Sequence, residues 1–353
     1  MKLLTTLFLF SFAFKASASE SSSLDSLADK INNDEFKQMT SVVVSQNNHI
    51  IYEKYFNKAT AETQHDMRSA SKSLTSLALG FAIDDGLIDN LDNPIFDYFN
   101  DKLPEKGSDV RKLKITIQDL LTMSSSLECD DWNDASRGNE EKMYIIEDWS
   151  GFILNLPIRG IPPWKKPPEN SKYGRSFSYC TGGVQVLTEL VERVTKMKMS
   201  EYLQIKLFNP LGINKPEFSY SPLGFTNGGG GAKLTSKDWI KIGNLMLNNG
   251  RANDKAIINE AWIKESLTRR AVIDEDRDIE YGYLWWINNV KVNDKTIIAY
   301  AAAGNGGNYL FFIPEFNASV LITSTAYNTS YMHVQSHKIL TDYALPELMK
   351  TAD

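Results

Sequence analysis

Strand-forming segments stand near both ends of this chain, and helical segments fill the middle. Near the N-terminus, "SVVVSQNNHIIYEKYF" contains two β-rich runs around Gln46-Asn47-Asn48, which predicts a hairpin. Further strand candidates follow one another late in the chain, in "YGYLWWIN", "TIIAYAAA", "NYLFFIP" and "ASVLITS". Because the strands at both ends need partners, we expect one antiparallel sheet built from both termini.

Helical periodicity surrounds these strands. Apolar residues recur at helical spacing over 24–39, over 69–86 with a buried stripe on one face, and over 332–345 just before Pro346. We therefore expect a mixed α/β fold of the α+β type, in which N- and C-terminal helices flank the sheet and a helical domain is inserted. The expected sheet lobe covers about 24–68 and 226–353, the helical lobe covers about 69–225, and the proline-rich stretch 157–170 forms a rim loop.

The first residues have the features of a secretory signal peptide. Lys2 precedes an apolar run over 3–14, and Ala16-Ser17-Ala18 supplies the small residues that signal peptidase accepts. We expect cleavage after Ala18 and a periplasmic or secreted protein, so that the mature domain covers 19–353. No later segment offers about eighteen uninterrupted apolar residues, so no stable membrane span is expected.

Charge and residue types argue against several classes of function. The formal net charge of -6 argues against a nucleic-acid partner, whose phosphates attract a basic surface. The four histidines are scattered without metal-ligand spacing, and the acidic segment "CDDWND" is interpreted as a solvated loop and not as a calcium site. We therefore expect neither a metal nor an organic cofactor. "GGGGAKLTS" only imitates a phosphate-binding loop and is interpreted as a glycine-rich turn into a helix.

Cys129 and Cys180 are the only cysteines of the chain. In an oxidising compartment they could pair, and a bridge across the residues between them would stabilise the protein by up to about 4 kcal/mol. Two unrelated buried thiols are an equally good interpretation. The sequence leaves both alternatives open.

Ser69 and Lys72 are a candidate nucleophile and base in the helix start "RSASKSLTS". Residues at i and i+3 share a helix face, so the lysine amine can reach the serine hydroxyl. A lysine can take the proton of the serine if burial lowers its pKa, and the helix N-terminus favours the negative charge that develops. The pattern is weak by itself, because S-x-x-K also arises by chance and a serine-capped surface helix would explain it.

Segments that cover nearly the whole mature chain give this pair a context: "RSASKSLTSLALGFAIDDGLID", "LDNPIFDYF", "ITIQDLLTMSSSL", "FSYCTGGVQVLTELVERVT", "GGGGAKLTSKDWIKIGNLMLNNG", "YGYLWWI" and "AAAGNGGNYLFFIPE". In this order they resemble the serine β-lactamase and penicillin-binding protein superfamily, in particular its class C β-lactamase-like esterases and aminohexanoate-dimer hydrolases. The resemblance implies the β-lactamase/transpeptidase-like fold and an acyl-enzyme mechanism. It also implies a small-molecule ester, amide or peptide as the substrate.

The resemblance assigns roles to individual residues. Ser69 matches the nucleophile, Lys72 its lysine partner, and Tyr179 the tyrosine whose oxygen acts as general base and acid. We expect a neighbouring ammonium to lower the pKa of Tyr179 and burial to lower that of Lys72. The family also places the loop that ends at Cys129 at the cleft edge, and Cys180 follows Tyr179, so a bond between the two cysteines would join two cleft segments.

By the same resemblance, the backbone N–H groups of Ser69 and Asn305 form the oxyanion hole, with Gly304 and Gly306 as near alternatives for the second donor. Glycines there let the strand approach the substrate closely, although a plain hairpin turn would also explain them. The expected substrate cleft includes Thr181, Ala303, Gly304, Gly306 and Trp285, and Trp132, Trp149 and Trp164 could also line it.

Two departures from the family motifs bear on the substrate. The Y-x-N motif of β-lactamases reads Tyr179-Cys180-Thr181 here, and the K-T-G-like motif reads Ala302-Ala303-Gly304. The cation and hydroxyl that would bind a β-lactam carboxylate are therefore missing, so we expect an ester or a small amide. A D-amino-acid peptidase, a true β-lactamase and a penicillin-binding-like sensor without turnover stay open as alternatives, as does the oligomeric state. A Ser-His-Asp mechanism built on His65 is not expected, because the G-x-S-x-G turn is absent.

Overall fold

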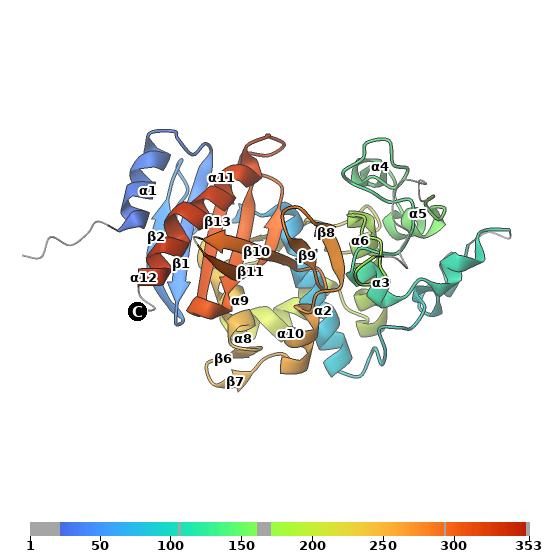
Figure 1. Cartoon of the computed structure of the whole chain (residues 1–353). Helices are drawn as coiled ribbons and strands as arrows, with labels where there is room; N and C mark the ends of the chain where they lie inside the picture. The colour runs from blue at the N-terminus through green and yellow to red at the C-terminus, as the bar shows by residue number, and fades with distance from the viewer. Residues whose placement is uncertain (1–21, 105–106, 161–170, 293, 351–353) are drawn as a thin grey trace, which may run out of the picture.

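An eight-stranded antiparallel sheet joins the two ends of the chain. The computed structural model describes residues 22–104, 107–160, 171–292 and 294–350 (Figure 1). The strand order β2-β1-β13-β12-β11-β10-β9-β8 places the N-terminal hairpin beside the C-terminal strand β13, which confirms the expected sheet. The strands are β1 Met39–Gln46, β2 His49–Tyr55, β8 Ala271–Asp274, β9 Ile279–Tyr281, β10 Trp286–Val292, β11 Lys295–Gly304, β12 Asn308–Ile313 and β13 Ala318–Ser324.

Three sequence predictions fall on residues that the structure does not describe. The expected signal peptide, 1–18, lies outside the described residues. Most of the expected rim loop, 161–170, lies outside them as well, and so does Trp164 within it. These interpretations stay predictions, and so does the division of the chain into a sheet lobe and a helical lobe.

The N-terminal hairpin has the turn that its sequence predicts. Asn47 and Asn48 have φ angles of 51° and 63°, which fits a two-residue turn of the primed type between β1 and β2. The preceding helix is shorter than expected: α1 covers Ser23–Asn32, and the chain then turns at Asp34, whose φ is 62°. A residue in the left-handed region cannot continue a right-handed helix, so the apolar pattern up to Met39 already leads into β1.

Helices from both ends of the chain cover one face of the sheet. α1, α11 (Met332–Ile339) and α12 (Leu345–Lys350) lie together, in blue and red in Figure 1, and share a buried apolar cluster with the sheet. The last helical stretch continues past Pro346, where we expected it to end. The π-helical turn Leu340–Ala344 joins α11 to α12, and its wider hydrogen bond, from the Leu345 N–H to the Leu340 carbonyl, comes directly before Pro346.

The other face of the sheet packs against α9 (Ser236–Leu247) and against the turn that precedes α2 (Lys72–Asp84). We expected α2 to be buried along one stripe, but every residue from Lys72 to Ala82 is buried, because helices such as α6 (Thr181–Thr195) cover its other side. Further helices are α3 Ile117–Leu121, α4 Glu140–Tyr144, α5 Trp149–Asn155 and α7 Met199–Leu203. A lysine at the start of α2 is therefore far from bulk water.

The segment expected to form a single strand, "YGYLWWIN", contains the end of one strand, a turn and the start of the next strand. In "YGYLWWIN", β9 ends at Tyr281 and β10 begins at Trp286, so Trp285 lies in the turn between them. Leu284 has a φ of 61°, which interrupts the extended backbone. Aromatic and β-branched composition alone does not reveal such a break. Within the described ranges, no helix combines the length and apolar character needed to cross a bilayer.

Candidate active site

The Ser69–Lys72 motif starts the central helix. Ser69 lies in a short 3-10 turn, Arg68–Ser71, and Lys72 is the first residue of α2. This helical geometry brings the two side chains together, and Lys72 Nζ donates a hydrogen bond to Ser69 Oγ over 2.8 Å. The contact has the geometry that the i and i+3 spacing predicts.

The residue before Ser69 has an unusual backbone conformation. Arg68 has a φ of 50°, in the left-handed region, where a bulky residue is strained by about 1–3 kcal/mol. Its N–H donates to Asp66 Oδ1 over 3.0 Å, and its guanidinium lies 4.6 Å from the centre of the Tyr327 ring. The Tyr327 hydroxyl in turn donates to the Asp66 carbonyl over 2.9 Å. Such strain, held by its surroundings, marks the Ser69 turn as a candidate functional site.

Lys72 is buried among neutral oxygen atoms. It is 1% exposed, and besides Ser69 its Nζ contacts the Gly229 carbonyl, to which it donates over 2.7 Å. Burial lowers the pKa of Lys72 to about 8, although the negative charges of Glu140 and Asp131 act in the opposite direction. About a tenth of the lysine is therefore neutral at pH 7 and able to accept the proton of Ser69.

The glycine-rich segment 227–231 brings the Gly229 carbonyl to the lysine. A Cβ atom at Gly229 would lie 2.6 Å from the methyl group of Thr181, so only glycine allows the loop to pass this close to the start of α6. We interpreted this segment as a turn into a helix. Its additional role is to hold the amine of Lys72, and a carbonyl oxygen has no signature in the sequence.

Tyr179 is the third member of the polar group that also contains Ser69 and Lys72. Its hydroxyl lies close enough to Ser69 to influence its own pKa, and Lys72 Nζ lies 5.0 Å from the centre of its ring. We expected a neighbouring ammonium to lower the pKa of Tyr179, and this expectation was wrong. Burial raises the pKa of Tyr179, the charges of Asp131 and Glu140 raise it further, and the nearby Ser69, which lowers it, does not compensate. Tyr179 is therefore a neutral phenol at rest, which leaves Lys72 as the candidate base.

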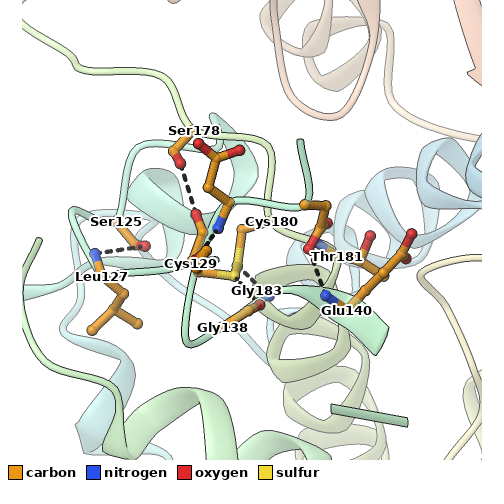
Figure 2. The surroundings of a disulfide bond; sticks show 12 residues. Ser125, Leu127, Cys129, Gly138, Glu140, Ser178, Cys180, Thr181 and Gly183 are labelled. Atoms are coloured by element: carbon orange, nitrogen blue, oxygen red, sulfur yellow. Dashed lines mark hydrogen bonds between the residues drawn. A yellow bond between two sulfur atoms is a disulfide. The ribbon is translucent and has the colours of Figure 1, made fainter. Parts of the chain in front are cut away.

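A disulfide bond joins Cys129 to Cys180, the residue that follows Tyr179 (Figure 2). Of the two alternatives that the sequence left open, the structure has the paired one. The bond ties the loop 128–139 to the start of α6, and the Ser178 hydroxyl donates a further hydrogen bond to the Cys129 carbonyl over 2.7 Å (Figure 2). Both chain neighbours of Tyr179, Ser178 and Cys180, are thus bonded to Cys129.

Asp131 lies in this loop and caps two helices with one carboxylate. Its Oδ2 accepts a hydrogen bond from the Thr181 N–H over 2.6 Å, and its Oδ1 accepts one from the Glu140 N–H over 2.9 Å. Burial and the charge of Glu140 raise the pKa of Asp131 to about 6. We interpreted "CDDWND" as a solvated loop, and for Asp131 this was wrong, because two helix starts enclose its carboxylate. Within the described ranges, no group of His, Cys, Asp and Glu side chains is placed to hold a metal.

A cavity of about 380 Å³ opens beside Ser69. Asn305 forms part of its wall and is held through its side chain: Nδ2 donates to Asn328 Oδ1 over 2.6 Å, and the Asn328 N–H donates to Asn305 Oδ1 over 2.9 Å. The cavity therefore contains both residues expected to supply the oxyanion hole. Its lining residues, most of them polar or charged, are Asp66, Arg68, Ser69, Glu140, Glu141, Tyr144, Ser219, Asn227, Gly229, Gly230, Gly231, Lys233, Asn305, Tyr327 and Asn328.

A known family matches this arrangement across most of the chain. The sequence pattern of the Beta-lactamase family matches residues 32–340. The chain belongs to the Beta-lactamase family.

Relatives of the chain are hydrolases. The chain is 25% identical over 255 residues to the 6-aminohexanoate-dimer hydrolase of Paenarthrobacter ureafaciens. The aligned part covers 69% of this chain and 63% of that protein, so the chain spans less than two thirds of the relative's length. A solved structure from Bacillus anthracis, provisionally named a 6-aminohexanoate-dimer hydrolase, is similar with a TM-score of 0.72 at 18% identity, covering 91% of this chain and 82% of the other. EstCE1, a hydrolase with promiscuous acyltransferase activity, gives a TM-score of 0.69 at 13% identity, with 90% and 97% covered. The expected β-lactamase/transpeptidase-like fold is confirmed, and the chain belongs to a family whose relatives include hydrolases.

The structure corrects several of the expected cleft residues. Thr181 and Trp285 are 0% and 1% exposed, so neither forms the surface of the cavity. Ala303 is buried in the apolar cluster on the opposite face of the sheet, beside the terminal helices, because successive residues of a strand point to opposite faces. Gly306 is also buried and is absent from the described lining of the cavity, and a Cβ atom there would lie 2.7 Å from the Tyr327 ring.

Gly304 has a structural role beside the nucleophile. A Cβ atom at Gly304 would lie 1.9 Å from the Met67 carbonyl, so only glycine lets β11 touch the turn that carries Ser69. This contact brings the next residue, Asn305, to the wall of the cavity. That the backbone N–H of Asn305 is the second oxyanion donor stays a prediction.

Of the described tryptophans expected at the cleft, Trp132 is the one that reaches the surface beside Tyr179. It is 59% exposed, whereas Trp149 is 7% exposed and packs inside the helical part. The tryptophan of β10 that contacts the Tyr179 ring is Trp286, at 5.9 Å between ring centres, and not Trp285. Two adjacent tryptophans in a strand candidate face opposite ways, and the sequence does not say which of them faces the site.

Sequence reasoning missed the charged groups that approach Lys72 from a distant loop, Asp131 and Glu140. One signal was available, because Asp131 follows Cys129 by two residues and the family resemblance placed that cysteine at the cleft edge. Nothing in the sequence distinguishes Glu140 from its exposed neighbour Glu141.

Proposed function

We propose that this protein hydrolyses an ester or a small amide through an acyl-enzyme formed on Ser69. The observation that carries the proposal is the buried Lys72, whose Nζ lies 2.8 Å from Ser69 Oγ and whose pKa falls to about 8. A serine hydroxyl beside a partly neutral amine is an activated nucleophile.

The groups present support a two-step mechanism. Lys72 accepts the proton of Ser69 Oγ as this oxygen attacks the carbonyl carbon, and the oxyanion forms beside the backbone N–H groups of Ser69 and Asn305. The bond to the leaving oxygen or nitrogen then breaks, and that atom takes up the proton through the Tyr179 hydroxyl. Water attacks the acyl-enzyme in the same way, which releases the carboxylic acid and restores Ser69.

The charges near Ser69 favour an ester or a small amide over a β-lactam. β11 ends in Ala302-Ala303-Gly304, where the family motif would supply a cation and a hydroxyl. The cavity lining has three acidic side chains, Asp66, Glu140 and Glu141, and two basic ones, Arg68 and Lys233, and this acidic excess disfavours a substrate carboxylate. The relative from Paenarthrobacter ureafaciens is named a 6-aminohexanoate-dimer hydrolase, which supports the amide part of the proposal.

Covalent labelling combined with a substrate panel tests this function. We expect a fluorophosphonate to label the peptide that contains Ser69, and short p-nitrophenyl esters to be turned over through an acyl-enzyme visible by mass spectrometry. Ser69→Ala should lose both the label and the turnover. Short-ester hydrolysis by Ser69→Ala at the parental rate would refute the mechanism. Faster turnover of D-Ala peptides or nitrocefin would favour the peptidase or β-lactamase alternative, and labelling without turnover would favour the sensor.

We also propose that the chain is exported and cleaved after Ala18. The disulfide between Cys129 and Cys180 supports this location, because stable disulfides form mainly in oxidising compartments. Protein recovered from a periplasmic fraction should begin at Ser19 by N-terminal sequencing. An uncleaved chain confined to the cytosol would contradict the proposal.

A further inference from the structure

Four aromatic residues form a surface beside Ser69 that we call the aromatic wall: Trp132, Phe177, Tyr179 and Trp286. The Trp132 ring is nearly parallel to the Tyr179 ring, with 5.3 Å between the centres and 4° between the planes. The rings of Phe177 and Trp286 lie 5.8 Å and 6.4 Å from that of Trp132. Trp132 belongs to the loop 128–139 and Trp286 begins β10, so the wall joins the helical part to the sheet.

Trp132 is exposed although its loop is firmly held. The residue is 59% exposed, yet the disulfide at Cys129 lies three positions before it, and the neighbouring Asp131 bonds to two backbone N–H groups. A large ring that stays in water on a fixed loop has little conformational freedom left to lose on binding. Trp132 is therefore preorganised to bind an apolar group at a low cost in conformational entropy.

The aromatic wall and the charged cavity are separate surfaces. The described lining of the cavity includes Ser69 but no residue of the aromatic wall. It includes acidic and basic side chains such as those of Asp66, Glu140 and Lys233. A substrate whose carbonyl carbon lies at Ser69 can thus place one part against charged groups and the other against aromatic rings.

We propose that the aromatic wall binds the leaving group, and that favoured substrates release an aromatic or otherwise apolar alcohol or amine. This inference rests on the proposed function. When Ser69 Oγ bonds to the carbonyl carbon, the bond to the leaving atom breaks, its electron pair stays on that atom, and the proton from Ser69 reaches it through Lys72 and Tyr179. The leaving atom then lies at the Tyr179 hydroxyl, and the group that it carries lies beside Trp132. The acyl group stays on Ser69 and occupies the charged cavity.

Acetate esters that differ only in the leaving group test this assignment. Phenyl acetate and hexafluoroisopropyl acetate release alcohols of similar acidity, but only the first is aromatic. We expect Trp132→Ala to lower the ratio of kcat/KM for phenyl over hexafluoroisopropyl acetate roughly two- to tenfold, the range of an aromatic contact. Trp132→Phe should restore most of the ratio. Ile205→Ala, at a 52% exposed apolar residue after α7, is the control and should leave it unchanged.

A reciprocal series separates binding from positioning. With p-nitrophenol as the constant leaving group and acetyl, butyryl or hexanoyl as the acyl group, Trp132→Ala should not change the preference among acyl groups. An equal loss on phenyl and hexafluoroisopropyl acetate would mean that Trp132 only holds Tyr179 in place, and it would overturn the proposal.

Binding of the product analogue 2-naphthol gives a readout that needs no turnover. In the Ser69→Ala protein, naphthol should perturb the NMR signal of the Trp132 indole, and adding Trp132→Ala should weaken binding severalfold. If the parent hydrolyses no ester but naphthol binds in this way, the proposed function fails while the aromatic wall stands. Naphthol affinity that Trp132→Ala leaves unchanged overturns the wall. So does a concentration-dependent dimer that the same substitution abolishes, which would assign the exposed ring to a second copy.

Discussion

Lys72 and Lys102 are both largely buried, but they face different neighbours. Lys72 is 1% exposed and donates to a hydroxyl and a carbonyl, those of Ser69 and Gly229. The Lys102 side chain is 12% exposed, and its Nζ lies 2.6 Å from Asp148 Oδ1 and 3.3 Å from Glu189 Oε1.

The difference shows that burial alone does not give a lysine its role. Carboxylates compensate the loss of water around an ammonium, whereas neutral dipoles compensate it only in part. Lys72 is thereby the base of the proposed mechanism, and Lys102 forms a structural ion pair that links the segment before α3 to the N-cap of α5 and to α6. The predictions below test this contrast.

The largest expected effect is on turnover. Lys72→Met keeps the apolar stem and removes the amine, so kcat for p-nitrophenyl acetate should fall about 10³-fold or more, equivalent to about 4 kcal/mol. Lys102→Met should retain turnover within about threefold, because Lys102 does not touch the cavity lining. Comparable losses of kcat in the two variants would abolish the contrast between the lysines.

The next prediction concerns the bond that holds Asp131 near Lys72. Replacing Cys129 and Cys180 by serine should lower the free energy of unfolding by up to about 4 kcal/mol, because the bond restricts the unfolded chain. Urea titrations with and without dithiothreitol measure this. Reductant should shift the parent to the stability of the double variant and leave that variant unchanged, whereas a parent insensitive to complete reduction would contradict the prediction.

Stability should reverse the order of the two lysine variants. Lys102→Met should lower the free energy of unfolding by about 1–3 kcal/mol, because Glu189, with a side chain 1% exposed, would keep only its contact with Arg193. Lys72→Met should not destabilise the protein, because it removes a buried amine without a carboxylate partner. Both are measured by urea unfolding at pH 7. Greater destabilisation by Lys72→Met would show that its amine is also a structural group.

The smallest expected effect is a change in pH dependence. Lys72 is neutral above its pKa of about 8, so kcat/KM should rise with pH and reach half of its maximum near that value. The charge of Glu140 raises this pKa, so Glu140→Gln should move the profile to lower pH by a fraction of a unit, less than about 1.4 kcal/mol. Glu147→Gln, at a carboxylate outside the cavity lining, is the control. A shift to higher pH would show that Glu140 does not act on Lys72 through its charge.

Much of the fold could be predicted from the sequence, because it depends on short-range patterns. The Asn47-Asn48 turn and the strands β11 to β13 follow from residues close in the chain. The sequence predictions were wrong where residues far apart in the chain determine the local structure or the pKa. The helical pattern after α1 stopped at the positive φ of Asp34, and "YGYLWWIN" was divided by a buried turn that packs against the helical core. The expected fall in the pKa of Tyr179 failed because aromatic rings from other segments enclose the phenol.

The sequence by itself determined that Ser69 and Lys72 meet, since one helical turn places residues three apart on the same face. It also determined the order of segments that assigns the chain to its family. Only the tertiary structure decided that Lys72 faces the Gly229 carbonyl, that Cys129 pairs with Cys180, and that Trp286 and not Trp285 stands beside the site. These outcomes depend on desolvation and on contacts between segments far apart in the chain, and no local spacing contains that information.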